Sequence, residues 1–177
     1  MNKILQDYIF IFIRYIILVI VALPNFYLFY LIFTPLTIYA SYGILNVFYN
    51  LTLNQNIIQV VGCTSIEIVP ACVAGVAYYL LLVLNLAIPK IEIKKRLFLF
   101  LSSFSMLFLI NVLRISILSA MYINNIASFD VIHKVFWYAG STIIVVIIWF
   151  LNIKLFNIKG IPFYTDLKFM YQKIKGN

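Results

Sequence analysis

The stretch LFLFLSSFSMLFLINVLRISILSAMYI, residues Leu97–Ile123, is the most informative part of this chain. About 20 mostly apolar residues form a transmembrane helix, so this run is long enough to cross a bilayer. Arg114 is the only charged residue within it. An arginine at the bilayer centre costs roughly 2.5 to 3.5 kcal/mol on insertion scales, and such a residue usually has a function and a partner. We therefore expect a specific partner for Arg114.

The composition of the whole chain is typical of an integral membrane protein. Of its 177 residues, 65% are hydrophobic and 10% are charged, whereas a soluble domain is nearer half apolar and one quarter charged. This length accommodates a single membrane domain over residues 1–177. The net charge of +8 would suggest nucleic acid for a soluble protein. Here the charges flank apolar runs, and no nucleic-acid partner is expected.

Four segments qualify as transmembrane helices, and none has the period-two alternation of barrel strands. They are Ile11–Phe33 with an expected kink at Pro24, Pro70–Ile88, Leu97–Met121 and Val135–Phe156.

One further segment, Pro35–Tyr49, is apolar but short, and it is followed by the polar residues 50–59. A span there would move the next basic loop to the outside, so the charge pattern favours a helix that lies in the outer interface or re-enters the membrane. The sequence thus predicts an all-α integral membrane protein, a bundle of about four transmembrane helices plus one outer interfacial or re-entrant helix.

Lys and Arg residues gather at the amino end, in the loop Lys90–Arg96 and after Lys154, whereas residues 34–69 contain none. Cytoplasmic loops are enriched in these residues. Both termini are therefore predicted to be cytoplasmic, and residues 157–177 are expected to form a basic tail on the inner membrane surface.

Three residues of different spans share one depth in the outer leaflet on this topology. Cys72 begins the second span, Arg114 lies about 7.5 Å outward of the middle of the third at 1.5 Å per residue, and His133 begins the fourth. A thiolate is a nucleophile, a histidine can move its proton, and an arginine can stabilise an oxyanion. The trio indicates acyl transfer through a thioester.

Asn111 shares a helix face with Arg114, and Glu67 lies on the outer side, so both are candidate supporting residues. Each candidate also has a structural interpretation. Asn111 can simply bond a neighbouring helix, and His133 can be a polar interfacial residue.

The other two members of the trio have structural interpretations as well. Cys72 can be a small apolar residue or can form a disulfide with Cys63. Arg114 can pair with Glu67 or Asp130, the acids on the outer side.

Several other catalytic classes lack their signatures in this sequence. Two cysteines and one histidine cannot build a zinc cluster of the usual kind. The sequence contains no HExxH helix, GxSxG elbow or phosphate-binding glycine loop, and no aspartate lies within a span. No metal and no cofactor are expected.

Three short motifs resemble the exosortase/archaeosortase family. They are Pro70–Gly75 (PACVAG), Asn111–Ile115 (NVLRI) and His133 followed by Gly140, and the resemblance covers roughly Val61–Phe156. Many family members have Cys-Ser-Gly, whereas two residues separate the cysteine from the glycine here.

The resemblance implies that Cys72 is the nucleophile, Arg114 the active-site arginine and His133 the third, basic member. It also implies a protein-sorting transpeptidase in the cytoplasmic membrane whose site faces the extracytoplasmic side. Such an enzyme cleaves a carboxyl-terminal tripartite sorting signal of a protein substrate and transfers the new carboxyl end to an acceptor such as a membrane lipid. Two other classes stay open: a small transporter or channel with Arg114 as its anion site, and a non-catalytic membrane assembly factor.

Overall fold

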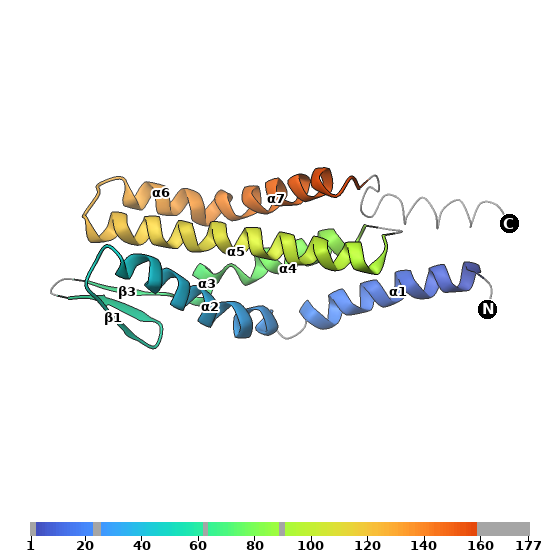
Figure 1. Cartoon of the computed structure of the whole chain (residues 1–177), viewed down its shortest axis with the longest axis horizontal. Helices are drawn as coiled ribbons and strands as arrows, with labels where there is room; N and C mark the ends of the chain where they lie inside the picture. Colours follow the sequence, from blue (N-terminus) through green and yellow to red (C-terminus); the bar gives the residue numbers. More distant parts are fainter. Residues whose placement is uncertain (1–2, 23–25, 62–63, 89–90, 159–177) are drawn as a thin grey trace.

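The computed structural model describes residues 3–22, 26–61, 64–88 and 91–158, which form an elongated helical molecule. Helices α1 and α2 follow each other along the long axis, α4 and α5 run beside α2, and α7 packs on α4 and α5 (Figure 1). The helices are α1 (Lys3–Ala22), α2 (Tyr27–Asn46), α3 (Pro70–Val73), α4 (Gly75–Leu86), α5 (Ile93–Ile123), α6 (Phe129–Val135), the π-helix η1 (Phe136–Gly140) and α7 (Ser141–Leu155).

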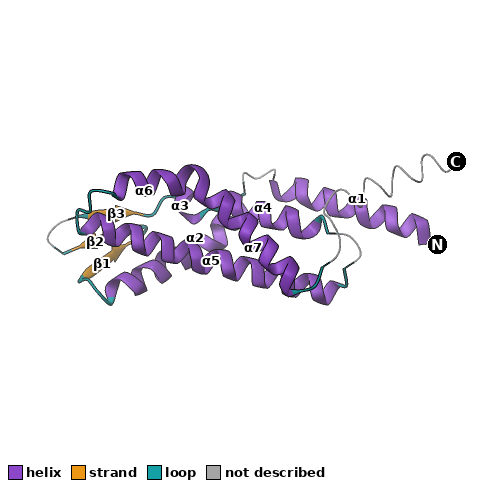
Figure 2. Cartoon of the chain, turned by 90° about the horizontal axis from the view of Figure 1, so that it is seen from above, coloured by secondary structure: helices purple, strands orange, loops and turns teal. Residues whose placement is uncertain are grey.

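A small antiparallel sheet of three strands covers one end of the bundle, in the order β1-β2-β3. Its strands are β1 (Leu51–Asn54), β2 (Ile57–Val60) and β3 (Ser65–Glu67). The sheet lies at the same end as α6, and the amino end of α1 lies at the opposite end (Figure 2). Ile58 and Ile68 are buried against Ile115 of α5, so the sheet is anchored to the helices by apolar contacts.

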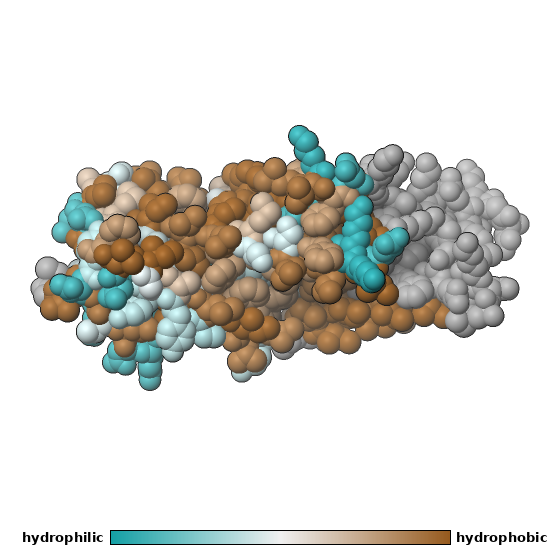
Figure 3. Space-filling view, viewed as in Figure 1, coloured by the Kyte–Doolittle hydropathy of each residue, from teal (hydrophilic) through white to brown (hydrophobic). Residues whose placement is uncertain are grey.

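The middle of the molecule presents an apolar surface between two more polar ends (Figure 3). Leu109, Leu113 and Ile117 of α5 are each more than half exposed. Their spacing of four residues places them on one helix face, which in water would be an aggregation-prone stripe. Three helical stretches in the described residues are long and apolar enough to cross a membrane, namely Tyr27–Asn46, Ile93–Ile123 and Phe129–Leu155. We therefore describe the protein as membrane-embedded.

The first predicted span, Ile11–Phe33, is wrong as a single helix. Phe26 adopts a left-handed conformation with φ 61°, which a right-handed helix does not accept, and α2 begins directly after it. Residues 23–25, including Pro24, lie outside the described residues.

The predicted interfacial segment Pro35–Tyr49 is also corrected, because its larger part lies within α2. Pro35 sits inside this helix and removes only its own N–H from the hydrogen-bond ladder, a loss that apolar helices tolerate when they pack against neighbours. The second predicted span is a shorter apolar helix, Pro70–Leu86. It is interrupted at Ala74, which has φ 61°.

An all-α fold is likewise incomplete, because the polar residues after α2 form the β1–β2 hairpin. Gln55 takes the left-handed conformation that its turn requires, with φ 54°.

Gly75 leaves room for the ring of Tyr30 from α2 at the start of α4, and its replacement should be costly. A Cβ at Gly75 would lie 2.6 Å from Cζ of Tyr30, whereas one at Gly43 would meet nothing within 4 Å. Gly75→Ala is expected to lower the free energy of unfolding by about 1–3 kcal/mol through overpacking. Gly43→Ala serves as the control and should be neutral or stabilising. Denaturation by SDS measures both, and equal stabilities would contradict this packing.

Candidate active site

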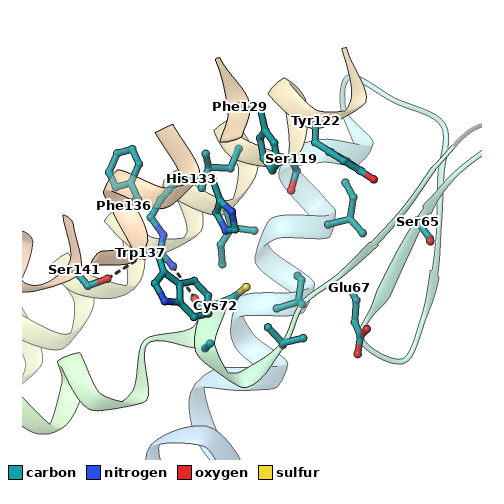
Figure 4. Close-up of a pocket in the computed structure, with 17 residues that line it drawn as sticks. Ser65, Glu67, Cys72, Ser119, Tyr122, Phe129, His133, Phe136, Trp137 and Ser141 are labelled. Atoms are coloured by element: carbon teal, nitrogen blue, oxygen red, sulfur yellow. Dashed lines mark hydrogen bonds between the residues drawn. The ribbon is translucent and has the colours of Figure 1, made fainter. Parts of the chain in front are cut away.

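A pocket of about 380 Å³ opens at the sheet end of the bundle. Its wall is built by β3, the turn of α3, the outer part of α5, α6 with η1, and the first residue of α7. Four residues predicted from the sequence line it: Glu67, Cys72, Arg114 and His133. Figure 4 shows the His133 ring and the Cys72 sulfur pointing into the same space.

Cys72 lies in a single helical turn between the sheet and α4. Val69 is extended, as expected for a residue before proline, and Pro70 starts the turn, where its missing N–H costs nothing. Ala74 then ends the turn with φ 61°. The thiol of Cys72 is free and partly buried, and the alternative of a disulfide needs Cys63 as its second partner. Cys63 itself lies outside the described residues.

The interruption at Ala74 leaves backbone carbonyls that need other donors. The N–H of Ala77 donates to Ala74 O at 2.9 Å instead of to Val73, its partner in a continuous helix. Asn111 Nδ2 supplies the missing hydrogen bonds, donating to Cys72 O at 2.9 Å and to Val73 O at 3.4 Å. The buried Asn111 amide therefore fixes the backbone of the cysteine turn to α5.

Arg114 is the second donor to this turn. Its Nη2 donates to Cys72 O at 3.2 Å and its Nη1 donates to Ser141 Oγ at 3.1 Å. The partner of Arg114 is thus the cysteine residue, through its carbonyl, and the thiol lies within electrostatic range of the guanidinium. Arginine has five N–H donors. The buried Nε–H meets no acceptor in the described part of the chain. Nη1 and Nη2 each use one N–H in the two hydrogen bonds above, so each has a second N–H left. Arg114 therefore retains donors for a bound group.

His133 is held by aromatic rings. It stacks on Phe129 with ring centroids 5.4 Å apart and meets the edge of Trp137 at 6.0 Å. The imidazole makes no hydrogen bond within the described residues, and it lines the same pocket as Cys72. These three residues form one wall of the pocket because positions 129, 133 and 137 are four apart and share one helix face.

Glu67 stands at the exposed rim and does not pair with Arg114. Its carboxylate accepts a hydrogen bond from Asn56 Nδ2 at 3.1 Å, which ties the end of β3 to the hairpin turn. The alternative that Arg114 pairs with Glu67 or Asp130 is therefore wrong, because its guanidinium is engaged by Cys72 and Ser141.

Ser141 and the aromatic pair Phe129 and Trp137 line the pocket but were not predicted from the sequence. Ser141 directly follows η1, and an extra residue in a π-turn shifts the helix face that follows. The i, i+4 spacing of the two aromatic residues around His133 was the available signal. Among the described residues, no group of three His, Cys, Asp or Glu side chains is placed to hold a metal ion.

Asn111→Leu is expected to slow alkylation of Cys72 and to lower stability, since two carbonyls of the cysteine turn lose their donor. Asn85→Leu is the matched control. Asn85 is also buried, and its amide donates to Ser103 Oγ at 3.0 Å between α4 and α5, away from the pocket. Both variants should lose roughly 0.6–1.7 kcal/mol of stability, the range of hydrogen bonds between membrane helices. Only Asn111→Leu should change the rate at which iodoacetamide labels Cys72. Equal labelling rates in the two variants would contradict the role of Asn111 in fixing the cysteine turn.

Comparisons with known family models, with curated proteins and with solved structures find no match for this chain. Its function is therefore argued from its own residues and their geometry.

Proposed function

We propose that this chain is a membrane cysteine transpeptidase of the exosortase/archaeosortase type. It cleaves the carboxyl-terminal sorting signal of a protein substrate and transfers the new carboxyl end to an acceptor such as a lipid. The observation that carries the proposal is the shared pocket of Cys72, Arg114 and His133, three residues of separate elements. The motif resemblance described from the sequence supplies the reaction class.

In the first half of the reaction, His133 takes the thiol proton of Cys72 and the thiolate attacks the scissile carbonyl carbon. The resulting oxyanion accepts hydrogen bonds from N–H groups of Arg114 that are not used by the protein. When the C–N bond breaks, His133 donates its proton to the leaving amine. The amino-terminal part of the substrate remains as a thioester on Cys72.

In the second half, a hydroxyl or amine of the acceptor attacks the thioester carbonyl. His133 takes the acceptor proton, and the C–S bond breaks to return Cys72 as a thiolate that His133 reprotonates. Arg114 stabilises the second oxyanion as it did the first. No redox partner is required, because every step moves only protons and an acyl group.

The proposed orientation places the pocket on the extracytoplasmic side and both chain ends in the cytoplasm. It is supported by the distribution of charge, since Lys94, Lys95 and Lys154 lie at the end opposite to the sheet (Figures 1 and 3). Lys and Arg are retained on the cytoplasmic side of membrane proteins. A substrate with an apolar span and a basic tail would also keep its basic end in the cytoplasm. The residues in front of its span would then lie on the same side of the membrane as the pocket.

Co-expression with a candidate protein that ends in such a tripartite tail tests the proposal. Mass spectrometry should find a new carboxyl end in front of the apolar span, with an acceptor attached. Cys63→Ser should give the same product, since this cysteine has no role in the chemistry. Full-length substrate in cells that contain the folded protein would contradict the proposal, and solute uptake by liposomes after thiol alkylation would favour a transporter.

A further inference from the structure

The pocket runs along the edge of β3 rather than over one face of it. Five consecutive residues, 65–69, line the pocket. Side chains of a strand alternate between its two faces, so a pocket on one face would contact only every second residue. No residue of β1 or β2 lines it. The pocket therefore lies beside the backbone of β3, on the side away from β2.

The hydrogen-bond register leaves this edge unpaired. Ile68 N donates to Asn56 O at 2.9 Å, and Val60 N donates to Thr64 O at 2.9 Å. Antiparallel pairing alternates, so residues 64, 66 and 68 point their N–H and C=O groups at β2, and Ser65 and Glu67 point theirs outward. Within the described residues these outward groups have no hydrogen-bond partner. Such an edge is a template for another strand.

The free edge leads directly to the thiol. The chain continues from Glu67 through Ile68 and Val69 into the turn that carries Cys72. On the opposite side, Phe129, His133 and Trp137 close the pocket. A volume of about 380 Å³ accommodates one extended segment.

We propose that the substrate binds as a fourth strand, an extended peptide paired with the free edge of β3, which delivers its scissile bond to Cys72. This inference rests on the proposed function and specifies how its substrate is held. Main-chain hydrogen bonds supply affinity in this mode, and pockets for alternate side chains supply specificity. The substrate segment before the cleavage point must therefore be extended and free of proline at the paired positions.

The test uses the full-length protein in detergent and short peptides selected from a random display library on the Cys72→Ala variant. Peptides are kept if they slow labelling of Cys72 by iodoacetamide in the Cys63→Ser variant. Each kept peptide is then N-methylated at one backbone position at a time. We expect affinity for the Cys72→Ala variant to fall roughly two- to tenfold per lost hydrogen bond, at every other position.

Two substitutions of Ser65 supply a matched pair on the protein side. Ser65→Pro removes an outward N–H without touching the pairing with β2, and proline is tolerated at the first residue of an edge strand. Ser65→Ala keeps the N–H and shows what the loss of the hydroxyl alone does, and Ser65→Pro should weaken binding by the same factor relative to Ser65→Ala. A flat N-methylation profile, equal binding by both variants, or a library without any protecting peptide would overturn the inference.

The two proposals fail in different ways. Peptides that bind with the alternating profile but are never cleaved by the unmodified protein would contradict the transpeptidase and leave the strand pairing intact. Cleavage of a peptide whose N-methylation profile is flat would contradict the strand pairing and leave the chemistry intact.

Discussion

Cys72→Ala is expected to leave the sorted protein uncleaved in the membrane. The substitution removes the only thiol that the structure places in the pocket within the described residues, and loss of a catalytic nucleophile lowers kcat by about 10⁴-fold or more. Immunoblotting of a tagged substrate in cells measures the result. Processing at the normal rate would rule out Cys72 as the nucleophile.

Two controls separate chemistry from folding in this experiment. Cys72 is partly buried, and its backbone contacts to Asn111 and Arg114 do not involve the sulfur. Cys72→Ala should therefore unfold in SDS at nearly the same concentration as the parent protein. Cys63→Ser should process the substrate normally.

Arg114→Lys is expected to lower processing by about 100-fold or more, the effect of losing one oxyanion donor. The planar guanidinium reaches Cys72 O and Ser141 Oγ at the same time through two nitrogens. A lysine ammonium is a point charge and lacks this fork. The rate of processing at equal protein levels measures the effect. Near-full activity would mean that the positive charge of Arg114 is sufficient and that its guanidinium geometry is not required.

Arg96→Lys is the matched control for this substitution. The guanidinium of Arg96 also donates to backbone carbonyls through two nitrogens. Its acceptors at the end of α4 are Asn85 O, Leu86 O and Ile88 O. Arg96 lies near the start of α5, whereas the pocket lies along residues 114–122 toward the other end of that helix. Arg96→Lys should lower stability but should leave the processing rate per folded molecule unchanged.

The sequence predicted which residues lie near Arg114, but it did not predict the hydrogen bond that Arg114 donates to Cys72 O. Charge bias and helical depth brought Cys72, Arg114 and His133 to one level, and the structure brings them to one pocket. The contact itself depends on the helix interruption at Ala74. Alanine is the strongest helix former and rarely adopts positive φ, so no local pattern predicts that Cys72 O is free to accept from Arg114.

The failures in the fold have a similar origin. Pro35 begins the predicted interfacial segment, but it lies inside α2, and the helix is interrupted at Phe26 instead. The polar residues 50–59 contain the β1–β2 hairpin, which the sequence did not predict. Its residues Leu51 and Ile58 are buried, yet strands of four residues are too short to show a periodicity that stands out from a loop.

The acyl-enzyme tests the central claim most directly. The protein is incubated with a substrate identified by co-expression, quenched in acid and digested, and the adduct is located by mass spectrometry. We predict a hydroxylamine-sensitive adduct on Cys72 that carries the amino-terminal part of the substrate and is absent from the Cys72→Ala variant. An adduct on another residue, or cleavage by the Cys72→Ala variant, would contradict the account.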